Sequence, residues 1–309
     1  MPSDVQYTEY RAGMTEIPVS PPSVAGMLQD FSIEVNPSQP KVLDAAMERL
    51  DPNTEVFLAW IPGANPLEKV APAAKLRRSG LIPVPHVGAR HLESAAQLEE
   101  FASRLAGEAG VDRVLIVAGD RAKPAGPYDS SLAVLETEVF QKRGITRVAV
   151  AGFPEGNPNI SDSALDEALA AKVKFARAAG LQLSLVTQFC FNADPILRWL
   201  RHIRAANIDV PVRIGLAGPA NLLTLTRYAI RCGIGNSLQL LTEHPSFARL
   251  LTEKGPEPII RGLAASVRDG NDAVQPGVAG LHFYVFGGFN KTLDWITAEL
   301  TPNTRPAHT

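Results

Sequence analysis

The sequence predicts an α/β protein in which eight parallel strands and their helices close into a single (β/α)₈ barrel, a TIM barrel. Eight short apolar runs recur along the 309 residues. Several are almost continuously apolar, Val114–Ala118 most clearly, which is typical of parallel strands covered on both faces. The segments between the runs have helical periodicity, and no shift in composition marks a linker.

The expected strands are the runs 31–35, 55–60, 82–87, 113–119, 147–152, 183–191, 212–218 and 281–287. Helical spacing of apolar residues follows the third run, from Leu92 to Leu105. Ser161–Ser163 offer N-caps to a long helix that Gly180 ends, and 194–206 and 221–232 have the same pattern. The stretch 233–278 leaves room for extra helices before the last strand.

The two ends of the chain differ from this pattern. Residues 1–29 are polar and contain several prolines, which predicts a loose N-terminal arm with a helical turn at Val24–Leu28. We therefore expect one barrel domain over residues 30–300 and a tail over 301–309.

Composition argues against several classes of protein. Lys and Arg number 30 against 32 Asp and Glu, so the basic face of a nucleic-acid-binding protein is not expected. No segment approaches the roughly 20 apolar residues of a membrane span, and no secretory signal opens the chain. The two cysteines and six histidines show no disulfide or metal-ligand spacing. We expect a cytoplasmic protein without a metal; a homo-oligomer stays open.

In a barrel of this type the active site lies where the strands end. Polar or glycine-rich positions occur at or just after those ends: Glu34, Pro62–Gly63, His86, Gly119–Asp120, Glu155, Gln188 and Gly215–Pro219. We therefore expect carboxylates, an imidazole and an amide to gather at one mouth. No phosphate-loop, dinucleotide or nucleophile-elbow motif accompanies them.

Each of these residues also has a purely structural interpretation. Glu34 lies in an apolar strand and is either solvated or, as we favour in a closed barrel, a buried acid with a raised pKa. Asp120 fits a turn cap equally well. Glu155 and Asn157 lie in a Gly/Pro-rich loop, which is either a plain turn or a close approach to a ligand. Gln188 requires hydrogen-bond partners that a substrate would supply, whereas a lone His86 is most simply structural.

Several segments occur in an order that resembles the methylenetetrahydrofolate reductase family. They are FSIEVNP at 31–37, PHVGAR at 85–90, AGD at 118–120, GFPEGNP at 152–158, VTQFCF at 186–191 and LHFY at 281–284. The resemblance covers roughly residues 30–295, with about one motif at each strand end.

The resemblance implies a flavin enzyme. In this family NAD(P)H reduces FAD, and the reduced flavin converts 5,10-methylenetetrahydrofolate to 5-methyltetrahydrofolate; the reverse direction in one-carbon catabolism is an alternative. Glu34 matches the general acid, and Asp120 the carboxylate that stabilises positive charge on the folate. Gln188 matches the residue that hydrogen-bonds the pterin. Leu223 falls where an aromatic residue often covers nicotinamide or folate.

The resemblance also implies a set of FAD-binding residues: His86, Gly119, Asp120, Tyr128, Ala151, Phe153, Glu155, Asn157, Asp166 and Lys172. Lys172 is assigned to the pyrophosphate, with Lys174 and Arg177 as alternatives. The chain departs from the family at Asn157, where a His is common, at Phe153, where a Tyr is common, and at Phe286–Gly288. These departures bear on FAD affinity and on the choice of nucleotide.

Three other functions remain as alternatives. A folate-dependent methyl-transfer enzyme would keep the barrel without a flavin. A non-catalytic folate-binding subunit would not need the acid at Glu34. A lyase or aldolase would need a Schiff-base lysine or a metal, and Lys69, Lys75 and Lys123 lie outside the predicted strands.

Overall fold

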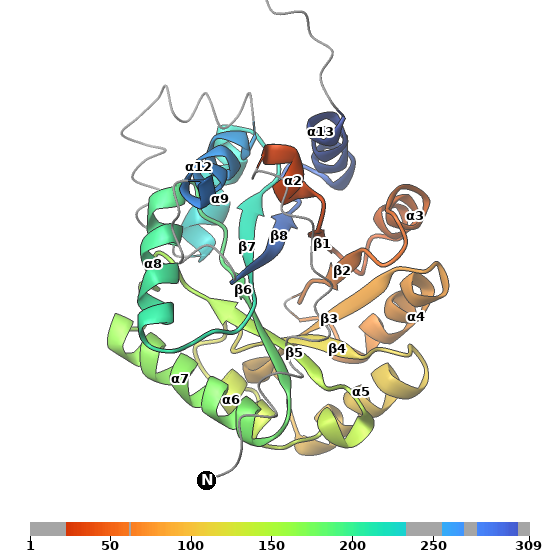
Figure 1. The fold of residues 1–309 in the computed structure, drawn as a ribbon. Helices are drawn as coiled ribbons and strands as arrows, with labels where there is room; N and C mark the ends of the chain where they lie inside the picture. Colours follow the sequence, from red (N-terminus) through yellow and green to blue (C-terminus); the bar gives the residue numbers. More distant parts are fainter. Residues whose placement is uncertain (1–22, 62, 233–254, 269–276, 302–309) are drawn as a thin grey trace, which may run out of the picture.

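The computed structural model describes residues 23–61, 63–232, 255–268 and 277–301. Its eight strands pair in parallel in chain order, and β8 pairs with β1 to close the barrel. The helices form the outer layer around the strands (Figure 1). The predicted (β/α)₈ fold is confirmed.

The strands are β1 (Phe31–Val35), β2 (Glu55–Leu58), β3 (Ile82–Gly88), β4 (Arg113–Val117), β5 (Arg147–Gly152), β6 (Gln182–Thr187), β7 (Val212–Ala217) and β8 (Val278–Tyr284). The helices are α2 (Val24–Leu28), α3 (Pro40–Arg49), α4 (Val70–Arg78), α5 (Ala95–Gly107), α6 (Ser131–Leu135), α7 (Asp162–Ala178), α8 (Ala193–Ala205), α9 (Leu222–Cys232), α12 (Glu257–Arg268) and α13 (Phe289–Leu300). Short 3₁₀ turns are η1 (Pro66–Lys69), η2 (Ala89–His91) and η3 (Gln141–Arg143).

All eight predicted strands exist, but some ends differ. The run 183–191 ends as a strand at Thr187, because Phe189 and Phe191 are buried by aromatic packing beyond it. β8 begins at Val278, three residues earlier than predicted. The prediction started the strand too late because Gly280, which has φ +148° within the strand, resembles a turn residue in the sequence. One extra helix before β8 is confirmed as α12; the remaining expectation for 233–278, most of the arm and the tail lie outside the described residues.

Side chains inside the barrel form levels along its axis. Phe57, Val84, Leu115, Ala149 and Val186, one each from β2 to β6, pack together as an apolar interior layer. Below it, towards the strand starts, Glu55 pairs with Arg113 (2.5 Å) and Arg213 (2.9 Å). Alternation along the strands places Glu34 and His86 above the layer, at the mouth. Ionisable side chains therefore occupy both ends of the interior, and the middle is mainly apolar.

Helices after β3 to β6 begin at the mouth with polar caps. Ser94, Ser130, Ser161 and Asn192 each accept a hydrogen bond from a backbone N–H of the first turn of α5, α6, α7 and α8. Such caps satisfy N–H groups that have no partner within the helix. The predicted cap at Ser161 is confirmed, and the caps fix the loops that carry the candidate site.

Candidate active site

The best-defined acid at the mouth is Glu34 on β1, beside His86 on β3. Glu34 Oε2 lies 3.5 Å from His86 Nε2, and the two side chains are 20% and 9% exposed. Burial raises the pKa of Glu34 to about 7. Burial, and then the charge of Lys69, lower the pKa of His86 to about 3. At neutral pH His86 is thus uncharged, and Glu34 holds its proton for a large share of the time.

A second buried histidine lies next to this pair. His282 on β8 shares a hydrogen bond of 2.9 Å between its Nδ1 and Ser32 Oγ, and its ring packs 4.5 Å from that of Phe57. Burial, followed by electrostatic interactions with His86 and with the charge of Arg213, lowers its pKa well below the usual value. Within the described ranges, Nε2 of His282 and Nε2 of His86 have no hydrogen-bond partner. Both imidazoles are therefore neutral, with unused polar atoms inside the barrel.

Asp120 follows β4 and is held by a histidine that the sequence reasoning missed. Its carboxylate is 61% exposed, and Oδ1 lies 2.9 Å from Nε2 of His91, whose side chain is only 7% exposed. Gly119 has φ +96°, and a Cβ there would lie 2.7 Å from the His91 ring. The only sequence signal for His91 was its place next to the motif at 85–90.

Arg90 braces the loop that carries Asp120. Its guanidinium donates to the carbonyl oxygens of Asp129 (2.8 Å) and Arg121 (3.0 Å), while its backbone pairs with Ala118 and Ala125. These bonds join the loop after β3 to the loop after β4. Arg90 was also missed as a functional candidate, because a side chain that braces a backbone leaves no pattern in the sequence.

Tyr128 lies at the end of the same loop. Its side chain is buried in the core, and burial, then Glu99, raise its pKa. It therefore packs the loop against the barrel, and its predicted contact with a flavin stays a prediction.

A buried lysine and a tryptophan lie behind His91. Lys69 is 2% exposed, and its ammonium lies 3.9 Å from the centroid of the Trp60 ring. The Trp60 and His91 ring centroids are 5.0 Å apart. Burial, partly opposed by Glu68, lowers the pKa of Lys69 to about 8. Neither residue stood out in the sequence, where Lys69 lies in an ordinary polar segment between strands.

Gln188 joins the end of β6 to the loop after β5. Its Nε2 donates to the carbonyl oxygen of Gly156 at 3.3 Å, so part of its hydrogen-bonding capacity is used within the protein. Glu155, in the same loop, lies beside Cys190: burial, and then Glu155, raise the pKa of that thiol well above its usual value. The structure thus brings Gln188 and Glu155 together, as their predicted positions at strand ends implied.

Asn157 has a turn role in the loop after β5. Its Oδ1 accepts from the backbone N–H of Asn159 at 2.9 Å, and its backbone bridges to Ile160. Ala151 and Phe153 are half-buried at the end of β5. The turn interpretation of Asn157 is therefore correct for its oxygen, while its amide N–H groups remain candidates for a ligand.

The residues predicted on α7 lie at different distances from the start of the helix, which is its end at the mouth. Asp166, near the start of the helix, pairs with His202 at 2.8 Å. Lys172 is half-buried, burial lowers its pKa, and no described carboxylate lies within 4 Å of it. Lys174 is exposed, and Arg177 donates to the carbonyl of Asn207 near the helix end that faces away from the mouth. Of these two residues, Lys172 is therefore the better candidate for the predicted contact with the FAD pyrophosphate.

Leu223 lies on α9 with 73% of its side chain exposed. α9 is fixed to the barrel by Tyr228, whose ring stacks on Phe286 at 3.9 Å, and Phe189 packs against Phe286 at 4.7 Å. The Phe286 departure from the family motif therefore builds an aromatic contact. The substrate-binding role of Leu223 stays a prediction.

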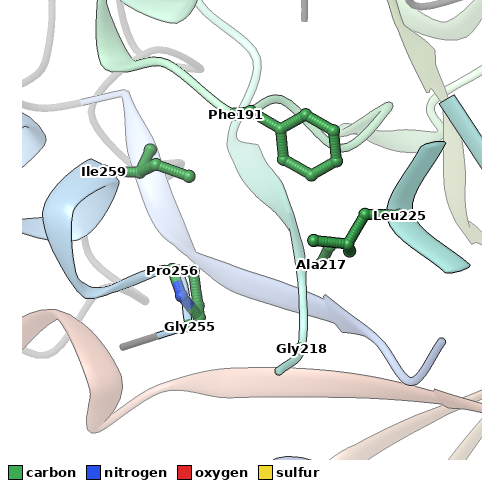
Figure 2. Close-up of a pocket in the computed structure, with 7 residues that line it drawn as sticks. All are labelled: Phe191, Ala217, Gly218, Leu225, Gly255, Pro256 and Ile259. Atoms are coloured by element: carbon green, nitrogen blue, oxygen red, sulfur yellow. The ribbon is translucent and has the colours of Figure 1, made fainter. Parts of the chain in front are cut away.

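A separate small pocket lies between α9, α12 and the end of β7 (Figure 2). It is lined by Phe191, Ala217, Gly218, Leu225, Gly255, Pro256 and Ile259. It has space for about one water molecule, and none of these side chains ionises. This pocket is a packing gap, and the chemistry-bearing side chains lie elsewhere at the mouth.

None of the helices in the described ranges has both the length and the apolar character needed to span a bilayer. No group of three or more His, Cys, Asp or Glu side chains in that part of the chain is arranged to hold a metal ion.

Comparisons with known proteins give a family. A sequence model described as methylenetetrahydrofolate reductase matches residues 41–288. A curated protein from Pectobacterium carotovorum subsp. carotovorum, named 5,10-methylenetetrahydrofolate reductase, is 26% identical over 193 residues. That match covers 61% of this chain and 62% of the relative, so less than two thirds of the relative's length is spanned.

Two solved structures are among those that match this chain. A beta-N-acetylhexosaminidase from Beutenbergia cavernae DSM 12333 has a TM-score of 0.41 and 13% identity, over 91% of this chain and 98% of that one. A D-hydantoinase has a TM-score of 0.42 and 13% identity, over 82% of this chain and 57% of that one.

Proposed function

The chain belongs to the methylenetetrahydrofolate reductase family, and from that premise we propose that it reduces 5,10-methylenetetrahydrofolate to 5-methyltetrahydrofolate with FAD and NAD(P)H. The observation that carries this proposal is the buried Glu34 beside a neutral His86 at the mouth. An acid of this kind is what the folate half of the reaction requires.

Glu34 supplies the proton. The five-membered ring of the substrate opens when an amine nitrogen leaves the methylene carbon, and that nitrogen must be protonated. A carboxyl group with a pKa near 7 still holds a proton at neutral pH and can give it up to an amine. The neutral His86, 3.5 Å away, adds no positive charge that would ionise Glu34 early.

Asp120 and Gln188 act on the folate after the ring opens. Ring opening leaves positive charge on the folate, and a carboxylate nearby stabilises it. Asp120 is mostly exposed at the mouth, so a ligand can reach it. Gln188 offers an amide to the pterin. It either gives up its hydrogen bond to Gly156 or uses the donor and acceptor positions that this bond leaves open.

The side chains present suit a bound flavin. When bound, FAD supplies the hydride chemistry, taking hydride from the nicotinamide and passing it to the folate. The buried Nε2 of His86 has no partner in the described ranges and can bond a flavin heteroatom. Lys172 has a half-buried ammonium without a nearby described carboxylate, which suits a pyrophosphate; Lys174 is the alternative.

An absorbance spectrum of the purified protein tests this proposal. We expect a flavin band that bleaches under anaerobic NADH or NADPH and returns on addition of methylenetetrahydrofolate. Glu34→Gln should keep the bleaching and lose the return. A colourless protein that cannot be reconstituted with FAD would contradict the proposal, and Asn157 and Phe153 would be the first positions to revert to the common family residues.

A further inference from the structure

We propose that His91 is the positioning residue for Asp120: it fixes the orientation of that carboxylate for the folate half-reaction. The inference rests on the proposed function, because it assigns a device that serves the same site. It depends on four observed features, namely a hydrogen bond, two close glycines, a ring contact and a buried cation.

The hydrogen bond joins groups of opposite exposure. The Asp120 carboxylate is 61% exposed, whereas the His91 side chain is only 7% exposed and is held in place by its neighbours. An ionised carboxylate only accepts, so Nε2 of His91 carries the proton at this 2.9 Å contact. A buried ring thus sets the direction of an exposed acid.

Two glycines make room for that ring. At Gly119 a Cβ would lie 2.7 Å from Cδ2 of His91, and φ is +96°, a conformation that favours glycine. At Gly88 a Cβ would lie 3.2 Å from the same atom and 3.1 Å from Trp60. Both strand ends therefore approach His91 as closely as a backbone can.

Trp60 and Lys69 complete the support. The Trp60 ring lies 5.0 Å from His91 with the planes 38° apart, and the Lys69 ammonium lies over Trp60. No carboxylate among the described residues lies within 4 Å of this buried ammonium. The ammonium therefore rests directly on the face of Trp60, while Glu68 acts on it from farther away, and this contact holds Trp60 in place against His91.

Two substitutions separate positioning from packing. His91→Phe keeps a ring against Trp60 and removes the donor. His91→Gln removes the ring and places an amide N–H near the position of Nε2. Loss of a hydrogen bond to a charged group corresponds to about ten- to a hundredfold in rate.

Stopped-flow measurements of the two half-reactions give the first readout. His91→Phe should slow flavin reoxidation by the folate by about ten- to a hundredfold, leave flavin reduction by the nicotinamide unchanged, and leave FAD affinity unchanged. His91→Gln should restore most of the lost rate. In the Asp120→Asn background His91→Phe should add no further loss, since the two residues act as one unit.

Ring NMR of the flavin-free protein gives a readout that needs no cofactor. Long-range ¹H–¹⁵N spectra should show His91 as the Nε2–H form in the wild type and a changed signal in Asp120→Asn. A colourless wild type would overturn the proposed function and this inference together. An active wild type with an equally active His91→Phe, or an unchanged His91 signal in Asp120→Asn, would overturn this inference alone.

Discussion

Replacing Glu34 by glutamine should stabilise the protein above neutral pH while abolishing the folate half-reaction. The glutamate is isosteric with glutamine, so packing beside His86 is retained. What changes is the cost of ionising a buried group. Burial raises the pKa of Glu34 from 4.5 to about 7 in the folded protein, and this difference from the unfolded chain links its ionisation to stability.

Glu34 makes the protein less stable as pH rises, because the folded protein binds its proton more tightly than the unfolded chain does. Between pH 4.5 and 7 the folded protein holds a proton on Glu34 that the unfolded chain has released. The stabilisation from this group is therefore fully present below pH 4.5 and is lost as pH rises through 7. At about 1.4 kcal/mol per pKa unit, the loss is about 3 kcal/mol at pH 8 and below about 1 kcal/mol at pH 5.

Urea unfolding, followed by circular dichroism at several pH values, measures how the free energy of unfolding of each protein changes with pH. The stability of Glu34→Gln relative to the wild type should increase by about 2.5 kcal/mol between pH 5 and pH 8. His91→Gln, which leaves Glu34 in place, serves as a control and should show no such trend. A difference between Glu34→Gln and the wild type that is the same at pH 5 and pH 8 would refute the assignment of Glu34 as a buried acid.

Three other substitutions test other parts of the molecule. Lys69→Met should remove a pH dependence of stability. As pH rises from 8 to 10.5, the free energy of unfolding of the wild type should increase by up to about 3 kcal/mol relative to the variant, because the folded protein releases the Lys69 proton at a lower pH than the unfolded chain does. Stability curves that stay parallel over this range would be inconsistent with a buried ammonium. Arg90→Ala should speed amide hydrogen exchange at residues 119–130 while exchange in β4 stays slow; unchanged exchange would mean that the loop is held elsewhere. Glu55→Gln should lower the free energy of unfolding by about 2 kcal/mol and leave flavin reduction unaffected, because Arg113 and Arg213 lose their shared carboxylate partner. A loss under about 0.5 kcal/mol would mean that this ionic cluster contributes no more than an exposed surface ion pair.

The fold was predictable because its main signal is local. A buried parallel strand must be apolar on both faces, and eight such runs leave few other architectures. The errors lie at the ends of strands. Phe189 and Phe191 are apolar because of packing beyond β6, and Gly280 lies within β8 although glycine usually marks a turn. A sequence pattern does not distinguish burial in a strand from burial after it.

The candidate site was predictable only in part. Glu34 stood out because an acid in an apolar strand is unusual, and its environment is as expected. His91 and Arg90 were missed because their partners, Asp120 and Asp129, lie 29 and 39 residues away in the chain. Lys69 was missed because its contact with Trp60, although close in sequence, depends on how the segment between β2 and α4 folds back. Nothing in the residue types themselves indicates such a contact, and only the closed barrel brings them together.

The levels inside the barrel bear on how freely this sequence can change. The ionic cluster around Glu55 lies below the apolar interior layer, and the acid at Glu34 lies above it. Arg213 of this cluster nevertheless acts on His282, which lies next to the acid, because its charge lowers the pKa of that imidazole. Substitutions at the lower end are therefore expected to change the electrostatics of the mouth as well as stability, and their effects should not simply add to those of substitutions at the mouth. An engineer who redesigns the mouth should keep the Glu55 cluster intact.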